Sequence, residues 1–303
     1  MPEANQIKIS HQVELGPELS DEVKDVARRQ GEDPDVSHLK IQELRDMIYE
    51  KGGCTPHRMD DEFLVKFLRA RFWKTQNAYK LLCRYYQFRN QNTQFYLGVH
   101  PIRLRSLGDE EIVSVPPYRD QDGRRLIIYK IGNWRPSKCP VEDIFRATLL
   151  IMEVGSLEPQ NQVLGSVGIF DLEGLAMNHA WQMTPAYAQK VIQLLVSHMP
   201  IRVSAIHIIN QGWIFDTVFQ FFKPFLNDRM KEKIFIHGSD LKSLHKFVDP
   251  TRLPVRYGGI QPEYPYKRWL EKIKYNEKVL NCLEQLGYVI DPDEINEISD
   301  PEE

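Results

Sequence analysis

The chain of 303 residues is poor in cysteine, and its cysteines form no pair of the kind that binds metal. No CxxC motif is present, and the four cysteines lie far apart, at Cys54, Cys83, Cys139 and Cys282. We expect free thiols of an intracellular protein, and the spacing argues against a zinc site. The sequence therefore predicts no bound metal.

Long hydrophobic runs are also missing. No apolar run approaches the roughly 20 residues that a membrane-spanning helix needs. The first ten residues, MPEANQIKIS, are too polar for a secretory signal. We therefore expect a soluble, cytosolic protein.

No excess of one charge sign marks the chain. It has 39 Lys and Arg against 42 Asp and Glu, a formal net charge of -3. This balance argues against a nucleic-acid partner, so any electrostatic function must come from a local patch. With 42% hydrophobic residues, the length suits one large domain and a smaller one. No internal repeat or low-complexity tract is visible.

The motifs of the common enzyme classes are absent. There is no GxGxxG, P-loop, HExxH or GxSxG. The closest approach to a nucleophile elbow is LGSVG at 164–168, which lacks the first glycine and enters a strand instead of leaving one. DQDG at 120–123 resembles part of a calcium loop without its remaining ligands. We predict no enzymatic activity, no cofactor and no metal.

A few titratable residues near predicted strands have a structural and a functional interpretation. Asp171 and Glu173 follow a buried strand, where catalytic acids often lie, but capping the next helix or holding the loop is the favoured role. His207 lies inside a strand, where a core histidine bonded to backbone is favoured over a ligand or base. His179 and His237 border strand ends without a second titratable group at a recognised spacing.

The first third of the chain is polar and then helical. Residues 1–37 predict one short helix in a flexible segment. Residues 38–53 read as a helix that stops at a glycine pair, and residues 60–91 alternate apolar and basic residues at helical spacing. We interpret residues 38–107 as a small helical domain.

Beyond residue 108 strands and helices alternate. Near-continuous apolar strands joined by helices indicate an α/β fold with a mainly parallel sheet and crossover helices. The predicted strands span 123–132, 166–174, 204–210 and 233–238, and the predicted helices span 141–158, 183–200 and about 214–226. A charged helix at 265–287 completes a domain at 108–287, and residues 288–303 predict an acidic, disordered tail.

The helix predicted around 214–226 has an unusually wide apolar side. Polar residues occupy its opposite face, while two rows of apolar residues recur at helical spacing. The rows are Ile214, Val218, Phe221 and Phe225, and Phe215, Phe219, Phe222 and Leu226. Leaving five such side chains exposed would forgo roughly 7–15 kcal/mol. Core packing, a bound apolar ligand or a membrane must therefore cover this side.

Two neighbouring features favour the ligand or the membrane over core packing. Pro224 removes a backbone hydrogen bond near the helix end, which creates either a hinge or a passive kink. Arg229, Lys231 and Lys233 follow directly. A basic segment beside an apolar helix suits an anionic lipid surface, although a solvated face alone also explains such charges.

Six segments together resemble the CRAL-TRIO lipid-binding family. They are FLVKFLRARFW (63–73), IFDLEG (169–174), HAWQMTP (179–185), HIINQGWIF (207–215), FKPFL (222–226) and LPVRYGG (253–259). They occur in the family's order, and the likeness runs from about residue 38 to residue 275. It is strongest to the tocopherol-carrying branch, with trafficking and retinaldehyde-carrying branches nearby.

The resemblance implies a fold and a moving part. A helical N-terminal domain would precede an α/β domain whose sheet floors a closed apolar cavity. A mobile lid helix would match the stretch around 210–233. Its apolar side would face the ligand when shut and a bilayer when open.

The resemblance also implies two sets of binding residues. The cavity lining would comprise Phe145, Thr148, Met152, Ser166, Leu175, Met177, Met183, Val191, Leu194, Leu195, Ile201, Val203, Ile206, Phe222, Phe225 and Leu226. Thr148 keeps a hydroxyl where the tocopherol-carrying branch has serine. Phosphoinositide headgroups would bind Arg71, Arg202, Arg229 and Lys233, and guanidinium groups suit phosphate because their planar donors pair with two oxygens. A further arginine of the family's cleft is Ser204 here, which weakens the expected site.

We therefore predict a cytosolic, monomeric carrier of a hydrophobic small molecule, either tocopherol-like, a retinoid or a carotenoid. It would exchange its cargo at phosphoinositide-containing membranes during transient peripheral association. The alternative is a membrane-trafficking adaptor whose main activity is phosphoinositide binding. An unrecognised hydrolase ranks third, because no nucleophile–base pair is visible.

Overall fold

The computed structural model describes residues 13–16 and 18–291. The first part of the predicted flexible segment and most of the predicted acidic tail lie outside these residues. Helix α1 spans Asp21–Arg29, where one short helix is predicted, and the Ser20 side chain caps it by accepting the backbone N–H of Val23. The predicted domain boundaries after residues 37, 107 and 287 stay predictions.

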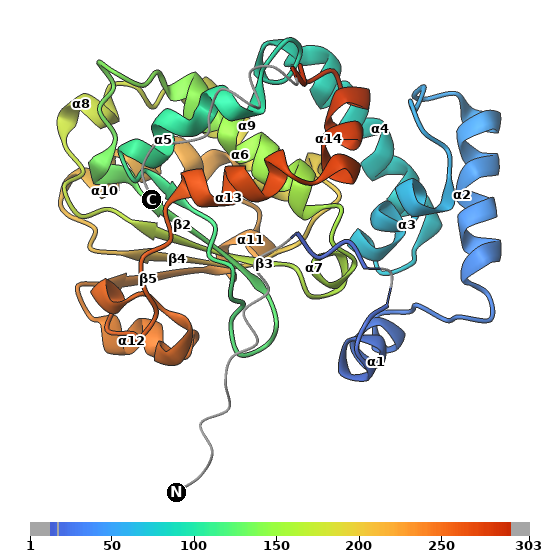
Figure 1. The fold of residues 1–303 in the computed structure, drawn as a ribbon, viewed down its shortest axis with the longest axis horizontal. Helices are drawn as coiled ribbons and strands as arrows, with labels where there is room; N and C mark the ends of the chain where they lie inside the picture. The colour runs from blue at the N-terminus through green and yellow to red at the C-terminus, as the bar shows by residue number, and fades with distance from the viewer. Residues whose placement is uncertain (1–12, 17, 292–303) are drawn as a thin grey trace, which may run out of the picture.

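Three helices form the helical region that follows. They are α2 (Ser37–Lys51), α3 (Asp61–Ala70) and α4 (Thr75–Gln91), which pack against one another (Figure 1). Helix α2 stops at Gly52, whose φ of 58° is a left-handed conformation that glycine adopts readily. Phe72 and Trp73, with φ of 53° and 57°, separate α3 from α4, because this backbone conformation cannot continue a right-handed helix.

A five-stranded sheet forms the centre of the rest of the chain. Its strands are β1 (Val113–Ser114), β2 (Arg125–Lys130), β3 (Ser166–Asp171), β4 (Val203–Ile209) and β5 (Ile234–Gly238), in that spatial order. Strands β2 to β5 are parallel, and β1 is antiparallel to β2. The predicted α/β fold with a mainly parallel sheet is confirmed. The two-residue β1 was not predicted, since it is too short to show a periodic pattern.

Helices connect and cover these strands. They are α5 (Ser106–Asp109), α6 (Val141–Gly155), α7 (Pro159–Leu164), α8 (Met177–Ala180), α9 (Pro185–Ile192), α10 (Ile214–Phe222), α11 (Asp228–Lys231) and α12 (Leu241–His245). Helix α9 continues as a π-helical segment, Gln193–His198. Short 3₁₀ segments span Thr93–Phe95, Pro101–Arg105, Ile131–Asn133, Lys223–Phe225, Pro250–Arg252 and Val255–Tyr257.

Side chains of the strands alternate between the two faces of the sheet. One face packs toward α12 and carries Leu126, Ile128, Val167, Ile169, Ala205 and Ile209. The other face lies toward α6 and α9 and carries Tyr129, Phe170, Ile206 and Ile208. Figure 1 shows α6 and α9 on one side of the sheet and α12 on the other.

The single helix predicted at 265–287 is wrong. The structure has two helices there, α13 (Tyr266–Lys274) and α14 (Glu277–Gln285). Asn276 begins α14 by accepting the backbone N–H of Val279 through its side chain, at 3.1 Å. The buried residues Ile273 and Val279 are also six positions apart, a spacing that one continuous helix would not place on one face.

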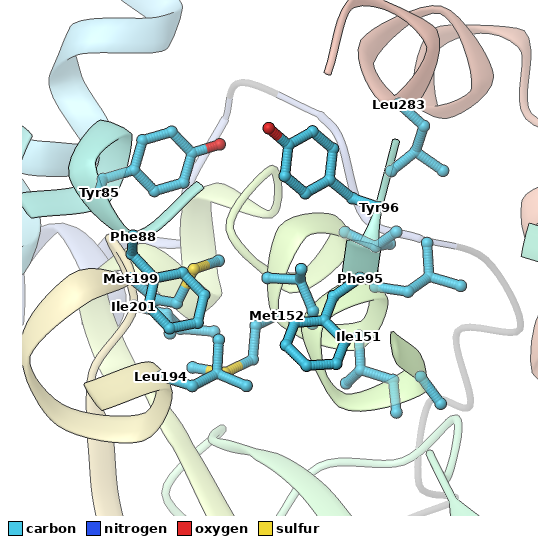
Figure 2. Packing of buried hydrophobic residues seen from close by; sticks show 14 of the residues in the cluster. Tyr85, Phe88, Phe95, Tyr96, Ile151, Met152, Leu194, Met199, Ile201 and Leu283 are labelled. Carbon is cyan, nitrogen blue, oxygen red and sulfur yellow. The ribbon is translucent and has the colours of Figure 1, made fainter. Parts of the chain in front are cut away.

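A large packed cluster joins the helical region to α6. Figure 2 shows some of its members, among them Tyr85 and Phe88 of α4 and Met152 of α6. Within it, the buried carboxylate of Glu153 accepts hydrogen bonds from Tyr85 and Arg89. These donors replace the water that the carboxylate loses on burial.

Candidate ligand cavity and cationic cluster

A cavity lies between the sheet and α6, α9 and α10. Its volume is about 220 Å³. Strand residues form the floor, with Tyr129, Phe170, Ile206, Ile208 and Ile234 among them.

Ten of the sixteen predicted lining residues lie in the wall of this cavity. They are Phe145, Thr148, Leu175, Met183, Val191, Leu194, Leu195, Ile206, Phe222 and Leu226. They come from α6, the segments before and after α8, α9 with its π-helical extension, β4, the end of α10 and the residue after the 3₁₀ turn Lys223–Phe225. The structure thus brings together residues far apart in sequence, while their contact with a ligand stays a prediction.

The other six predicted residues lie outside this wall. Met152 and Ile201 belong to the packed cluster of Figure 2. Ser166 and Val203 pair with each other at the starts of β3 and β4, whereas the cavity lies toward the other end of these strands. Met177 is 37% exposed on α8, and Phe225 is in the 3₁₀ turn after α10.

The wall also contains residues outside the predicted lining set, although Phe215, Val218 and Phe219 were among the apolar rows of the predicted lid helix. These additional residues are Tyr129, Ile131, Trp134, Val141, Ile144, Phe170, Leu172, His179, Tyr187, Ile192, Ile208, Phe215, Val218, Phe219 and Ile234. Tyr129 and Phe170 had a signal, because they alternate with residues of the opposite sheet face. Their rings stack with centroids 4.9 Å apart. Burial raises the pKa of Tyr129 to about 12, so its hydroxyl keeps its proton at neutral pH.

Helix α10 presents one of its two apolar rows to the cavity. The wall includes Phe215, Phe219, Phe222 and Leu226 of one row and only Val218 of the other. Polar residues of the opposite face, such as Asp216 and Gln220, are exposed, as the periodicity predicts. The α-helix ends at Phe222, two residues before Pro224. The wide apolar side of α10 therefore borders the cavity as well as packed side chains.

Three of the four predicted phosphoinositide ligands form a cationic cluster, which we define as Arg71, Arg202 and Lys233. Burial, and then the charge of Arg71, lower the pKa of Arg202 to about 10. Burial, and then the charges of Arg202 and Arg71, also lower the pKa of Lys233. Within the described residues, no carboxylate lies within ion-pair distance of these three side chains. Uncompensated, half-buried positive charge of this kind is what an anionic ligand neutralises.

The hydrogen bonds of the cluster go to uncharged groups. Arg202 donates to the Gln30 side chain at 2.8 Å, and Lys233 Nζ donates to the carbonyl of Val203 at 2.9 Å. The Nε of Arg202 is buried without a hydrogen-bond partner among the described residues. The fourth predicted ligand, Arg229, is exposed on α11. Ser204, at the position of the missing arginine, donates to the carbonyl of Leu164 at 3.0 Å.

The remaining titratable candidates have structural partners. Asp171 accepts hydrogen bonds from the backbone of Glu173 and from the side chains of Asn210 and Tyr257, so the loop-holding interpretation is confirmed. His207 is buried, as expected, but its Nδ1 lies 3.0 Å from Nε2 of His237 and not beside a backbone group. Over residues 13–16 and 18–291, no group of three or more histidine, cysteine or acidic side chains is placed to hold a metal.

No helix in the described part of the chain is long and apolar enough to cross a bilayer.

Comparison with known proteins gives matches over most of the chain. A CRAL/TRIO domain model matches residues 109–259, and a CRAL/TRIO N-terminal domain model matches residues 38–84. Clavesin-1 of Rattus norvegicus is 34% identical over 271 residues, which cover 88% of this chain and 75% of that protein. Clavesin-2 of Homo sapiens is 33% identical over 263 residues, covering 86% and 80%.

A solved structure also matches. The crystal structure of Sfh5 superposes with a TM-score of 0.54, covering 84% of this chain and 98% of that chain, at 17% sequence identity. At this identity the likeness supports the fold alone. The expected likeness to a tocopherol-carrying branch stays a prediction.

Proposed function

Because the chain belongs to the CRAL-TRIO family, we propose that it binds a hydrophobic small molecule in the cavity behind α10 and exchanges it at membranes. Family membership supports lipid binding and transfer as the broad class of function. The observation that carries the proposal is a cavity whose wall is almost wholly apolar. A lipid with about 500 Å² of apolar area gains roughly 12 kcal/mol when it leaves water, so a carrier must match that burial.

We propose α10 as the lid of this cavity. Proline has no backbone N–H, and the α-helix gives way to a 3₁₀ turn, Lys223–Phe225, around Pro224. This turn is the proposed hinge. Opening would expose five apolar wall residues of the lid segment, at a cost of roughly 7–15 kcal/mol. We therefore expect opening only where a bilayer covers the exposed side.

A tocopherol-like molecule, a retinoid or a carotenoid is the proposed cargo, as the family resemblance suggests. The test is lipid extraction and mass spectrometry of the purified full chain, after incubation with mixed-lipid vesicles. We expect one class of hydrophobic molecule to be retained. A chain that retains no lipid under these conditions would contradict the proposal.

A matched pair of variants links retention to the cavity. Val191 lies in the wall, whereas Val255 is 67% exposed and outside the wall. Val191→Trp fills the cavity and is expected to abolish most lipid retention, while Val255→Trp leaves it unchanged. Equal retention by both variants would place the lipid elsewhere. Thermal unfolding of both variants checks that each is folded.

The cationic cluster supports a second proposed contact, with phosphoinositide headgroups. Its three side chains lack carboxylate partners within the described residues, and Arg229 adds an exposed charge. Vesicle sedimentation with and without phosphoinositide tests it. The double variant Arg229→Ala/Lys233→Ala should bind such vesicles at least about tenfold more weakly, since each cation near an anionic surface contributes about 1 kcal/mol. Lys242→Ala, an exposed lysine on α12, is the control.

The alternative function is a membrane-trafficking adaptor that acts mainly by binding phosphoinositide. The cationic cluster and the likeness to clavesins favour it. The two experiments above separate the functions. A chain that binds phosphoinositide vesicles but takes up no hydrophobic cargo would be an adaptor, whereas retained cargo in the Arg229→Ala/Lys233→Ala variant would show two separate sites.

A further inference from the structure

The polar side chains of the cavity wall have no hydrogen left to donate to a ligand. The hydroxyl oxygens of Thr148 and Tyr129 lie 2.9 Å apart. Thr148 Oγ1 also lies 2.8 Å from the backbone carbonyl of Ile144. A carbonyl only accepts, so the single hydroxyl hydrogen of Thr148 is committed there. Tyr129 must then be the donor in its bond to Thr148, and its hydrogen is committed too.

The hydrogens of the other polar wall side chains are also used in hydrogen bonds within the protein. Trp134 donates its Nε1–H to the carbonyl of Cys139 at 2.7 Å. Tyr187 donates to the carboxylate of Glu142. His179 accepts the backbone N–H of Ala176 at Nδ1, 2.9 Å away, so the hydrogen on its Nε2 points to the carbonyl of Trp134, at 2.7 Å.

These side chains can still accept hydrogen bonds from a ligand. The oxygens of Tyr129 and Thr148 each keep acceptor capacity. The stacking of Tyr129 on Phe170, 4.9 Å between ring centroids and 8° between planes, fixes where the hydroxyl lies. A ligand hydroxyl can donate to this pair of oxygens. An aldehyde, ester or carboxylate oxygen can only accept and would be buried opposite other acceptors.

We propose that the cavity selects lipids that carry a hydroxyl group, alcohols or phenols, over lipids of the same skeleton that end in an aldehyde or a carboxylate. The selection rests on the proposed carrier function, because it assigns a cargo class to the same cavity. A buried polar group left without a partner is strongly disfavoured, which is how a protein discriminates molecules that differ by one functional group.

The experiment compares ligands that differ only in the polar group. Retinol, retinaldehyde and retinoate share one skeleton, and hexadecanol, hexadecanal and hexadecanoate share another. Binding to the full chain is measured by quenching of tryptophan fluorescence for the first set and by competition with retinol for the second. We expect the alcohol to bind at least about tenfold tighter than the aldehyde and the carboxylate. Equal affinities, or a tighter aldehyde, in both sets would overturn the proposal.

Variants at the two hydroxyls sharpen the test. Thr148→Val removes the acceptor of Tyr129 and frees the tyrosine hydrogen, so the preference should move toward the aldehyde by about tenfold. Thr148→Ser keeps the hydroxyl and should keep the alcohol preference. Tyr129→Phe should weaken alcohol binding without improving aldehyde binding. An alcohol preference that survives in both Thr148→Val and Tyr129→Phe would also overturn the proposal.

The outcome separates this inference from the function on which it rests. If hexadecane and every polar lipid fail to bind, the carrier function is wrong and the selection fails with it. If hexadecane and the polar lipids bind with equal affinity, the carrier function stands and the hydroxyl selection alone is wrong. Circular dichroism and thermal unfolding show whether each variant has kept its fold.

Discussion

The guanidinium carbon of Arg202 lies 4.9 Å from the centre of the Phe72 ring. This contact joins the helical region to the start of β4, and it places the ring beside the cationic cluster. Phe72 is half exposed and has a positive φ, so the turn after α3 holds it in a backbone conformation that few residues adopt. The turn thus presents Arg71 and orients Arg202 at the same time.

The aromatic ring should matter for binding to phosphoinositide vesicles. Phe72→Leu keeps an apolar side chain but removes the negative face of the ring, which attracts a guanidinium group. We expect the dissociation constant to rise about two- to fivefold, corresponding to 0.5–1 kcal/mol at an exposed site. Vesicle sedimentation measures it. Tyr49→Ala, an exposed aromatic on α2, should leave binding unchanged, and an unchanged Phe72→Leu would mean that the ring only fills space.

The buried ion pair between Arg89 and Glu153 should account for much of the coupling between α4 and α6. Their atoms lie 2.7 Å apart, and the side chains are only 5% and 1% exposed. Glu153→Gln leaves the arginine charge buried without a counter-charge, so the unfolding free energy should fall by about 3–5 kcal/mol. Urea denaturation measures this loss. Glu43→Gln, at an exposed pair with Lys40, should cost less than about 1 kcal/mol.

Sequence periodicity predicted those features of the fold that local spacing determines. The stop of α2 at Gly52 follows from the backbone freedom of glycine, which is a local property. The exposed face of α10, with Asp216 and Gln220, follows from the spacing of its apolar residues. The strands were predictable because parallel strands buried on both faces have nearly continuous apolar sequences.

The residues of the cavity wall could not be predicted from local sequence patterns alone. Thr148 lies in the wall, while Met152, one helical turn further along α6, lies in the packed cluster of Figure 2. Both residues occupy the same helical face, so only the position of neighbouring elements separates them. The same holds for the cationic cluster, whose members come from three separate segments. The family resemblance predicted these residues. The sequence pattern alone indicated only that Lys233 follows closely after the aromatic helix.

Protonation of the buried His207 should make the fold less stable in mild acid. Burial, and then the charge of His237, lower the pKa of His207 to about 4, from an ordinary value near 6.5. Between these values the unfolded chain binds a proton that the folded chain does not. The unfolding free energy should therefore fall as the pH drops from about 6.5 to about 4, by up to about 1.4 kcal/mol per pH unit for this one group.

Urea denaturation across that pH range measures the effect. His57, whose pKa burial also lowers to about 4, contributes to the same slope, so variants must be compared with the parent at each pH. In His207→Gln, the unfolding free energy should fall less steeply with decreasing pH, by up to about 1.4 kcal/mol per pH unit. His38→Gln, at an exposed histidine, should not change it. Parallel curves for the parent and His207→Gln would mean that this histidine titrates at its ordinary pKa.

Two exposed tryptophans mark the end of the molecule where we propose that the lid meets a membrane. Trp181 and Trp213 are 73% and 76% exposed, whereas Trp73, Trp134 and Trp269 are buried. Trp181 directly follows α8, Trp213 directly precedes α10, and these two helices pack together (Figure 1). Tryptophan favours the boundary between lipid headgroups and acyl chains.

Intrinsic fluorescence can therefore report membrane contact without a label. When phosphoinositide vesicles are added, tryptophan emission should move to shorter wavelength, because only the two exposed rings can change from water to lipid. Replacing either ring by alanine should weaken vesicle binding by at least about tenfold, since a buried large apolar side chain contributes about 1.5–3 kcal/mol. Tyr275→Ala removes an aromatic side chain that is also 76% exposed, at the junction of α13 and α14, and should have no effect. Sedimentation with vesicles while the emission stays unchanged would mean that the cationic cluster binds the headgroups without the α10 end entering the bilayer, and the proposed lid opening would then lack its apolar cover.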